Sequence, residues 1–320
     1  MILSNMIQVD LITGFLGAGK TTFIRRYVEY LRGQGEKIHI IENEFGKESV
    51  DSAILRNIED DDCHISDLAG MCMCCIGKSA FISMLVESSK ADIDRIIVEP
   101  SGIYDVDEFF DVMTDPRVSC CCEIGTIITI VDPFSRPVLT SEAEYLMFSQ
   151  LVASGTVLLS KTQLLDENGV QSAIDWIEGV VTSKGCENGL AAEYCVKPWD
   201  ELTDSDYEDF MDAGYYRMVH DREVFEHSGV FQSEELELEV ADKEELLHIV
   251  KMLFSHKEYG TVFRVKGYAR TRNEGCYEVN CTGDYIYCEK VKNINTNQNV
   301  IVIIGQHLKY SMFHPTLKIL

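Results

Sequence analysis

Residues 14–22 read Gly-Phe-Leu-Gly-Ala-Gly-Lys-Thr-Thr, a complete G-x-x-x-x-G-K-[ST] phosphate loop close to the start of the chain. Its glycines let backbone N–H groups curl around phosphates, and Lys20 neutralises the outer phosphate oxygens. Thr21 offers its hydroxyl to Mg²⁺, and the helix that follows turns its positive end toward the anion. The loop therefore predicts that a nucleoside triphosphate binds here. The predicted contacts are Gly14, Gly17, Ala18, Gly19, Lys20, Thr21 and Thr22.

The residues around the loop have the strand and helix patterns that it requires. Residues 7–12 form a short apolar run typical of a strand, and residues 22–31 carry apolar side chains at helical spacing. Further predicted strands cover residues 37–41, 93–98, 123–131 and 156–159, and predicted helices cover residues 79–88, 106–113, 141–153 and 166–177. This alternation predicts an α/β P-loop NTPase domain, at residues 1–215, with a mostly parallel sheet covered on both faces.

A second pattern begins after an acidic stretch that starts near residue 200, which we interpret as a solvated helix or a linker. Residues 231–240 alternate like a half-exposed strand, and residues 242–256 form an amphipathic helix with Asp242 as its cap. Four more strands are predicted at residues 261–265, 276–279, 285–288 and 300–304. We therefore assign residues 216–320 to a smaller α+β domain.

Charge and cysteine content limit the partners and the compartment. The 28 basic and 53 acidic residues give a formal charge of −25, which argues against nucleic acid or an anionic membrane as a partner. No apolar stretch approaches the ~20 residues that span a bilayer. Residues 1–5 also lack the basic region of a secretory signal. We expect a cytoplasmic protein whose 12 cysteines are thiols or metal ligands rather than disulfides.

A C-x-C-C cluster at residues 72–75 places three thiols within four positions. Such thiols can converge on one soft cation, of which Zn²⁺ is the best match, and Cys63, His64 or Asp67 could complete a tetrahedral site. A redox pair and inert core packing remain alternatives, although adjacent cysteines normally point in different directions. A second group, at residues 120–122, has no established ligand spacing, so core packing is the more economical interpretation. The predicted metal ligands in this cluster are Cys72, Cys74 and Cys75.

Acidic residues follow two of the predicted strands at the edge where the phosphate loop lies. Glu44 follows the strand at residues 37–41, where a nucleotide-sensing switch approaches Mg²⁺. Glu99 follows the strand at residues 93–98 and offers a carboxylate beside the phosphates, like a Walker-B acid. A single acidic residue is most often a solvent-facing group, but successive strand ends favour a functional role. We predict that both are Mg²⁺ ligands and that both act in catalysis with Lys20.

The tetrapeptide Ser160-Lys161-Thr162-Gln163 ends the strand at residues 156–159. Guanine-selective folds carry [NST]-K-x-D here, in which the lysine stem covers the base and the carboxylate accepts two hydrogen bonds from guanine. The amide of Gln163 has one acceptor oxygen and no charge, so it accepts these bonds less well. We predict base contacts from Ser160, Lys161 and Gln163, with a weaker preference for GTP than an aspartate would give.

The motifs described above, and their order along the chain, resemble those of the CobW-like GTPases, which are related to the HypB and UreG metal-insertion GTPases. The motifs are T-G-F-L-G-A-G-K-T-T, E-N-E-F-G, C-x-C-C, E-P-S-G and S-K-T-Q. Residues 264–267 and 302–305 look like second-domain signatures of that family, so the resemblance covers nearly the whole chain. It implies a slow, metal-responsive GTPase that acts as a metallochaperone. In that interpretation Lys20 and Thr21 bind phosphate and Mg²⁺, and the C-x-C-C thiols hold the cargo metal.

Several residues depart from the family pattern. Gln163 replaces the usual aspartate, Lys47 stands where an acid is common, and Pro100 replaces a small residue. The eight histidines are dispersed instead of forming a histidine-rich loop, which argues against bulk metal storage.

The resemblance leaves more than one function open. The leading hypothesis is delivery of a metal ion to a client protein or cofactor pathway, and a homodimer is a further candidate assembly. One alternative is a nucleotide-gated regulator that turns over slowly and recruits a partner through an edge strand of its C-terminal sheet. Others are a P-loop NTPase with relaxed base preference and a domain whose zinc is purely structural.

Overall fold

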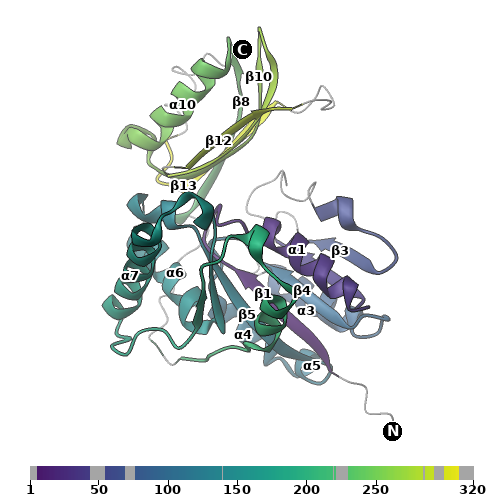
Figure 1. The fold of residues 1–320 in the computed structure, drawn as a ribbon. Helices are drawn as coiled ribbons and strands as arrows, with labels where there is room; N and C mark the ends of the chain where they lie inside the picture. Colours follow the sequence, from purple (N-terminus) through teal and green to yellow (C-terminus); the bar gives the residue numbers. More distant parts are fainter. Residues whose placement is uncertain are drawn as a thin grey trace. The chain divides into compact units, whose positions relative to one another are not determined.

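The computed structural model describes residues 6–43, 55–68, 76–138, 140–218, 220, 230–283, 285–291 and 299–309 (Figure 1). The chain divides into two compact units. The first comprises Met1–Pro133 and Ser141–Glu223, and the second comprises Phe134–Thr140 and Val224–Leu320. The boundary that we place between residues 215 and 216 stays a prediction.

The first unit is built on a seven-stranded sheet in which every pair of neighbouring strands is parallel. The strand order is β3-β2-β4-β1-β5-β6-β7. The strands are β1 (Ile7–Thr13), β2 (Ile38–Glu42), β3 (Cys63–Asp67), β4 (Arg95–Glu99), β5 (Cys122–Val131), β6 (Thr156–Leu159) and β7 (Glu193–Cys195). The predicted P-loop NTPase fold is confirmed.

Helices cover both faces of this sheet (Figure 1). They are α1 (Lys20–Gly33), α3 (Ile76–Ser88), α4 (Val106–Met113), α5 (Pro116–Ser119), α6 (Ser141–Ala153), α7 (Glu167–Ser183) and α8 (Asp204–Asp212). Val9 and Leu11 of β1 pack in one core with residues of α3 and α4, whereas Ile12 packs in another with residues of α1 and α8. Apolar side chains therefore occupy both faces, as a buried parallel strand requires. Within the described residues, every helix is too short or too polar to cross a membrane.

Two edge strands and the anchoring of one helix go beyond the sequence prediction. β3 and β7 were not predicted, because both are short and β3 (Cys-His-Ile-Ser-Asp) contains only one strongly apolar residue, Ile65. The acidic stretch near residue 200 contains α8, which carries a capping box between Thr203 and Asp206. The helix alternative is thus confirmed; Tyr207 and Phe210 are buried against α1, while most other side chains of α8 are exposed.

A fully buried carboxylate, Asp10 of β1, joins four elements or their flanking segments. Arg95 of β4 donates from Nη1 to both Asp10 oxygens at 3.0 and 2.9 Å, and the Tyr27 hydroxyl of α1 donates at 2.7 Å. The backbone N–H of Thr126 in β5 donates at 3.1 Å, and Arg95 also donates to Glu36 at 2.8 Å. Burial raises the pKa of Asp10, while the Arg95 guanidinium opposes that rise. The hydrogen bonds offset the desolvation of the charge.

The second unit is a six-stranded sheet with a helix on one face (Figure 1). Its strand order is β12-β11-β10-β13-β8, and β9 pairs with β10 in the parallel direction. Its elements are β8 (Gln232–Glu237), β9 (Glu239–Val240), α10 (Lys243–Ser255), η5 (Lys257–Tyr259), β10 (Thr261–Thr271), β11 (Gly275–Thr282), β12 (Tyr285–Lys290) and β13 (Val300–Gln306). Asp242 caps α10 by accepting from the N–H of Glu245 at 3.0 Å, which confirms the predicted cap.

We predict that Asp10→Asn destabilises the first unit strongly. The substitution leaves the Arg95 guanidinium buried without its full counter-charge, so the free energy of unfolding should fall by about 3 kcal/mol. Urea unfolding followed by tryptophan fluorescence measures this, because Trp176 and Trp199 both belong to the first unit. The matched control is Asp200→Asn, which removes an exposed ion pair with Arg26 and should cost at most about 1 kcal/mol. Equal effects of the two substitutions would contradict the prediction.

Candidate functional site

The phosphate loop connects β1 to α1 at the carboxyl edge of the parallel sheet. β1 is the strand on either side of which the later strands are added, so the loop lies at a topological switch point, where α/β sheets bind ligands. Gly14, Gly17 and Gly19 have φ angles of 141°, 74° and 104°, a region that favours glycine. Ala18 is buried, and Thr22 is exposed on the first turn of α1.

The amino end of α1 is open to an anion. Its N-cap, Gly19, has no side chain to cap the helix, and the first turn contains no acidic residue. The first backbone N–H groups of a helix have no partner within it, so they can bind phosphate oxygens. Lys20 is buried, and its Nζ donates to the carbonyl oxygen of Gly14 at 3.0 Å. Its positive charge is therefore held inside the loop.

Thr21 and Glu99 are brought together although 78 positions separate them in sequence. The Thr21 hydroxyl donates to Oε1 of Glu99 at 2.8 Å, and both side chains are buried. A hydroxyl oxygen and a carboxylate oxygen are hard ligands of the kind that Mg²⁺ prefers. The donor atoms of this pair, one of which lies in the helix turn that also carries Lys20, therefore suit a magnesium ion.

The Glu-Pro-Ser-Gly segment that begins at Glu99 also supports the phosphate loop, through Gly102. A Cβ atom on Gly102 would lie 2.5 Å from the backbone nitrogen of Leu16 and 2.8 Å from the carbonyl carbon of Phe15. Gly102 therefore packs directly on the backbone of the phosphate loop. The Glu-Pro-Ser-Gly segment thus combines a carboxylate and a backbone support for the loop.

Glu42 is a candidate residue that our sequence analysis did not select. It ends β2 and is in register with Asp67 of β3 on one side and Glu99 of β4 on the other. Glu42 is buried, and parallel strands in register turn such side chains to the same face. The sequence could have indicated Glu42, because it directly follows a predicted strand and lies two residues before Glu44. No group of three or more His, Cys, Asp or Glu side chains is placed to hold a metal ion among the residues described.

Four predicted residues lie outside the described residues, namely Glu44, Cys72, Cys74 and Cys75. The described chain stops at Leu68, just beyond the carboxyl end of β3, and resumes at Ile76, where α3 begins.

The proposed fourth ligands are placed at opposite ends of β3. Cys63 and His64 lie at its amino end, roughly 13 Å from the carboxyl end at about 3.3 Å per residue. Cys63 is buried, and burial raises the pKa of its thiol to about 11. A metal-binding thiolate is therefore disfavoured at Cys63. Asp67 lies at the carboxyl end of β3, in register with Glu42 of β2.

Contacts of Lys161 and Ser160 fix the position of the tetrapeptide that follows β6. Lys161 adopts a left-handed backbone conformation with φ of 57°, and its Nζ donates to Oδ2 of Asp132 at 2.7 Å. Ser160 is buried, and its hydroxyl donates to the carbonyl of Val131 at 3.4 Å. Gln163 is exposed in the short helix η3 (Thr162–Leu164). The carboxylate that binds Lys161 is thus that of Asp132, a buried residue directly after β5.

The cysteines at residues 120–122 differ in burial. Cys122 is buried at the start of β5, and burial raises its pKa to about 12, as the packing interpretation expects. Cys120 is exposed, so core packing does not account for it. The sulfur atoms of Cys121 and Cys122 are 3.9 Å apart.

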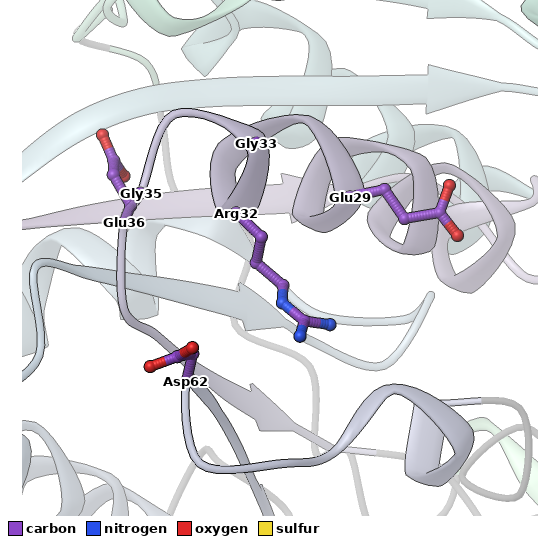
Figure 2. A pocket seen from close by; sticks show the side chains of 6 residues that line it. All are labelled: Glu29, Arg32, Gly33, Gly35, Glu36 and Asp62. Atoms are coloured by element: carbon purple, nitrogen blue, oxygen red, sulfur yellow. The ribbon is translucent and has the colours of Figure 1, made fainter.

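A hollow of about 380 Å³ lies at the carboxyl end of α1, away from the phosphate loop (Figure 2). The side chains that line it come from Glu29, Arg32, Glu36 and Asp62. α1 contains 14 residues, so at 1.5 Å per residue its two ends are roughly 20 Å apart. The acidic lining also repels phosphate, and we assign this hollow no part in nucleotide binding.

Comparison with known proteins supports the arrangement of motifs. Residues 8–184 match the family model described as CobW/HypB/UreG, nucleotide-binding domain. The chain belongs to this family. Residues 228–318 also match the model described as Cobalamin synthesis protein cobW C-terminal domain. The resemblance inferred from the motifs is confirmed.

Several relatives of this CobW-family chain are named zinc chaperones. One named CobW, from Pseudomonas aeruginosa, is 31% identical over 134 residues, which are 39% of this chain and 35% of that protein. Another named CobW, from Sinorhizobium, is 26% identical over 296 residues, which are 82% of this chain and 81% of that protein. The alignment thus spans about a third of the first relative and most of the second. The solved Zn(II)-bound YjiA GTPase from Escherichia coli is 17% identical, with 96% of each chain covered and a TM-score of 0.44.

We predict that Gly102→Ala weakens nucleotide binding. The added methyl group would overlap the backbone of the phosphate loop at Leu16, so the loop must shift, and the affinity for GDP should fall roughly tenfold. Isothermal titration calorimetry measures this affinity. The matched control is Gly179→Ala, because a Cβ atom at that helical position meets nothing within 4 Å. Equal GDP affinity in both variants would show that Gly102 does not support the loop.

Proposed function

We propose that the chain is a GTP-hydrolysing metallochaperone that binds Zn²⁺ at its C-x-C-C cluster and couples delivery of the metal to nucleotide state. The observation that carries the nucleotide part is the convergence of Lys20, Thr21 and Glu99 at the open amino end of α1. The metal part is supported by the thiol spacing in the sequence and by relatives that are named zinc chaperones.

Each residue of the loop has a separate task in phosphoryl transfer. Backbone N–H groups at the start of α1 bind phosphate oxygens, and the Lys20 ammonium moves from the Gly14 carbonyl to the outer phosphate. The Thr21 hydroxyl and the Glu99 carboxylate would hold a magnesium ion, whose positive charge would stabilise the transferring phosphoryl group. Glu44 is proposed to orient the attacking water.

Within this proposal, the carboxyl edge of the sheet couples the phosphate site to the segment that precedes the cysteines. Glu42 is in register with Glu99, which holds the Thr21 hydroxyl, and with Asp67, after which the chain runs toward Cys72. A change at the phosphate side can therefore reach the segment before the cysteines through neighbouring strand ends. Within this proposal, Asp67 is the oxygen ligand that completes the thiolate site. The expected partner is a metal-requiring client protein or cofactor pathway.

Anaerobic zinc competition against a chelator tests the coupling. We predict that Mg²⁺ with GTP changes the zinc affinity at least roughly fivefold relative to the GDP-bound protein, and that zinc changes GTP affinity by the same factor. Cys74→Ala should abolish tight zinc binding. Cys120→Ala is the matched control, because it removes an exposed thiol outside the cluster. Equal zinc affinity in the apo, GTP-bound and GDP-bound protein would refute coupled delivery.

Hydrolysis should depend on the charge of Glu99. Glu99→Gln keeps an oxygen that accepts from Thr21 but removes the carboxylate, so single-turnover GTP hydrolysis should slow by roughly a hundredfold or more. Glu123→Gln, an exposed carboxylate at the amino end of β5, serves as the control and should hydrolyse GTP at the wild-type rate. Unchanged hydrolysis in Glu99→Gln would remove Glu99 from the catalytic site.

A further inference from the structure

Trp199 lies where the phosphate-binding and base-binding segments of the first unit meet. A Cβ atom on Gly19, the last glycine of the phosphate loop, would lie 3.0 Å from Cη2 of the Trp199 indole. The same point is 3.9 Å from Cβ of Ser160, the first residue of the base tetrapeptide. The edge of the indole therefore stands beside both segments.

Two contacts hold the indole of Trp199 in place, and a third holds its backbone. Its Nε1 donates to the carbonyl of Leu159, the last residue of β6, at 3.1 Å. The ring meets Phe23 of α1 edge-on, with centroids 5.8 Å apart and planes at 63°. The backbone oxygen of Trp199 accepts from Arg26 at 3.1 Å, and Arg26 also pairs with Asp200. The segment is thus anchored to α1 on one side and to the tetrapeptide's strand on the other.

Topology explains why a residue so late in the chain reaches the site. Trp199 begins η4 (Trp199–Glu201), four residues after β7, and β7 pairs in parallel with β6. Parallel neighbours end at the same edge of a sheet, so the segments that follow β6 and β7 lie side by side. Trp199 is only partly buried, which leaves part of a fixed aromatic surface accessible at this edge.

The tetrapeptide itself offers little chemistry that distinguishes one base from another. Gln163 is an exposed amide, and Lys161 is engaged with Asp132. An aromatic ring, in contrast, offers apolar surface to any base, and a two-ring purine covers more of that surface than a pyrimidine does. The fixed ring and the missing carboxylate point to recognition by shape rather than by paired hydrogen bonds.

We propose that Trp199 forms the base-side wall of the nucleotide site and makes it selective for purine nucleotides, with little discrimination between guanine and adenine. Trp199 is a positioning residue that acts on the base and ribose, while Lys20 and Thr21 act on the phosphates. This inference rests on the proposed nucleotide binding.

Calorimetric titration with GDP, ADP, UDP and inorganic tripolyphosphate tests the proposal on the full chain. The wild type should bind GDP and ADP with affinities within roughly fivefold of each other and UDP at least roughly tenfold more weakly. Trp199→Ala should lower GDP affinity roughly tenfold and bring it close to that of UDP, while tripolyphosphate affinity changes by less than about twofold. Trp176→Phe, on α7, is the matched control and should keep the wild-type order.

Two outcomes would overturn the proposal. If Trp199→Ala weakens tripolyphosphate as much as GDP, the indole supports only the phosphate loop. If the ratio of GDP to UDP affinity is unchanged, the indole does not touch the base. A wild type that binds neither GDP nor tripolyphosphate refutes the proposed function itself, so the two failures are distinguishable.

Fluorescence gives a second readout that does not need a destabilising substitution. The chain contains two tryptophans, so Trp176→Phe leaves Trp199 as the sole emitter and Trp199→Phe leaves Trp176. GDP should change the emission of the Trp176→Phe protein more than tripolyphosphate does, and neither should change that of Trp199→Phe. A Trp176→Phe protein that binds GDP without any change in emission would overturn the proposal.

Discussion

The buried carboxylate of Asp10 is the constraint on which the nucleotide-binding unit depends. It accepts hydrogen bonds from β4, β5 and α1 while it belongs to β1, so one charge sets the relative positions of four elements. The phosphate loop begins at Gly14, four residues beyond Asp10, and ends where α1 begins. Because β1 and α1 are tied together through Asp10 and Tyr27, both ends of the loop are held before any ligand binds. A charge without these partners would be too costly to bury.

Close backbone packing then determines the shape of the loop. Gly14 approaches the carbonyl of Ile130 in β5, and Gly102 approaches the backbone of Leu16, with no room for a methyl group at either position. The loop is therefore enclosed by the ends of the strands next to β1. Glu99, three residues before Gly102, reaches Thr21 from the same strand end. One short segment thus contributes both the polar contact and the steric support.

Sequence reasoning succeeded where the signal was local and failed where it depended on distant contacts. The strands at residues 7–12 and 156–159 were recognisable because runs of apolar residues are typical of buried parallel strands. β3 was not predicted, because an edge strand is less buried and can carry polar side chains. The anchoring of α8 in the core was not predicted for a related reason, since its buried apolar residues, Tyr207 and Phe210, are few among many carboxylates. Only the folded structure shows that these two side chains pack against α1.

The sequence by itself determined that the chain has a phosphate loop between a strand and a helix, that parallel strands follow it, and that the motifs are those of the CobW family. These are properties of spacing and residue type, which the chain carries without folding. Tertiary structure alone decided that Glu42 stands beside Glu99, that Cys63 lies at the amino end of its strand, and that Trp199 reaches Gly19. Such contacts arise because parallel strands collect distant residues at one edge, and no local pattern records which ones will meet.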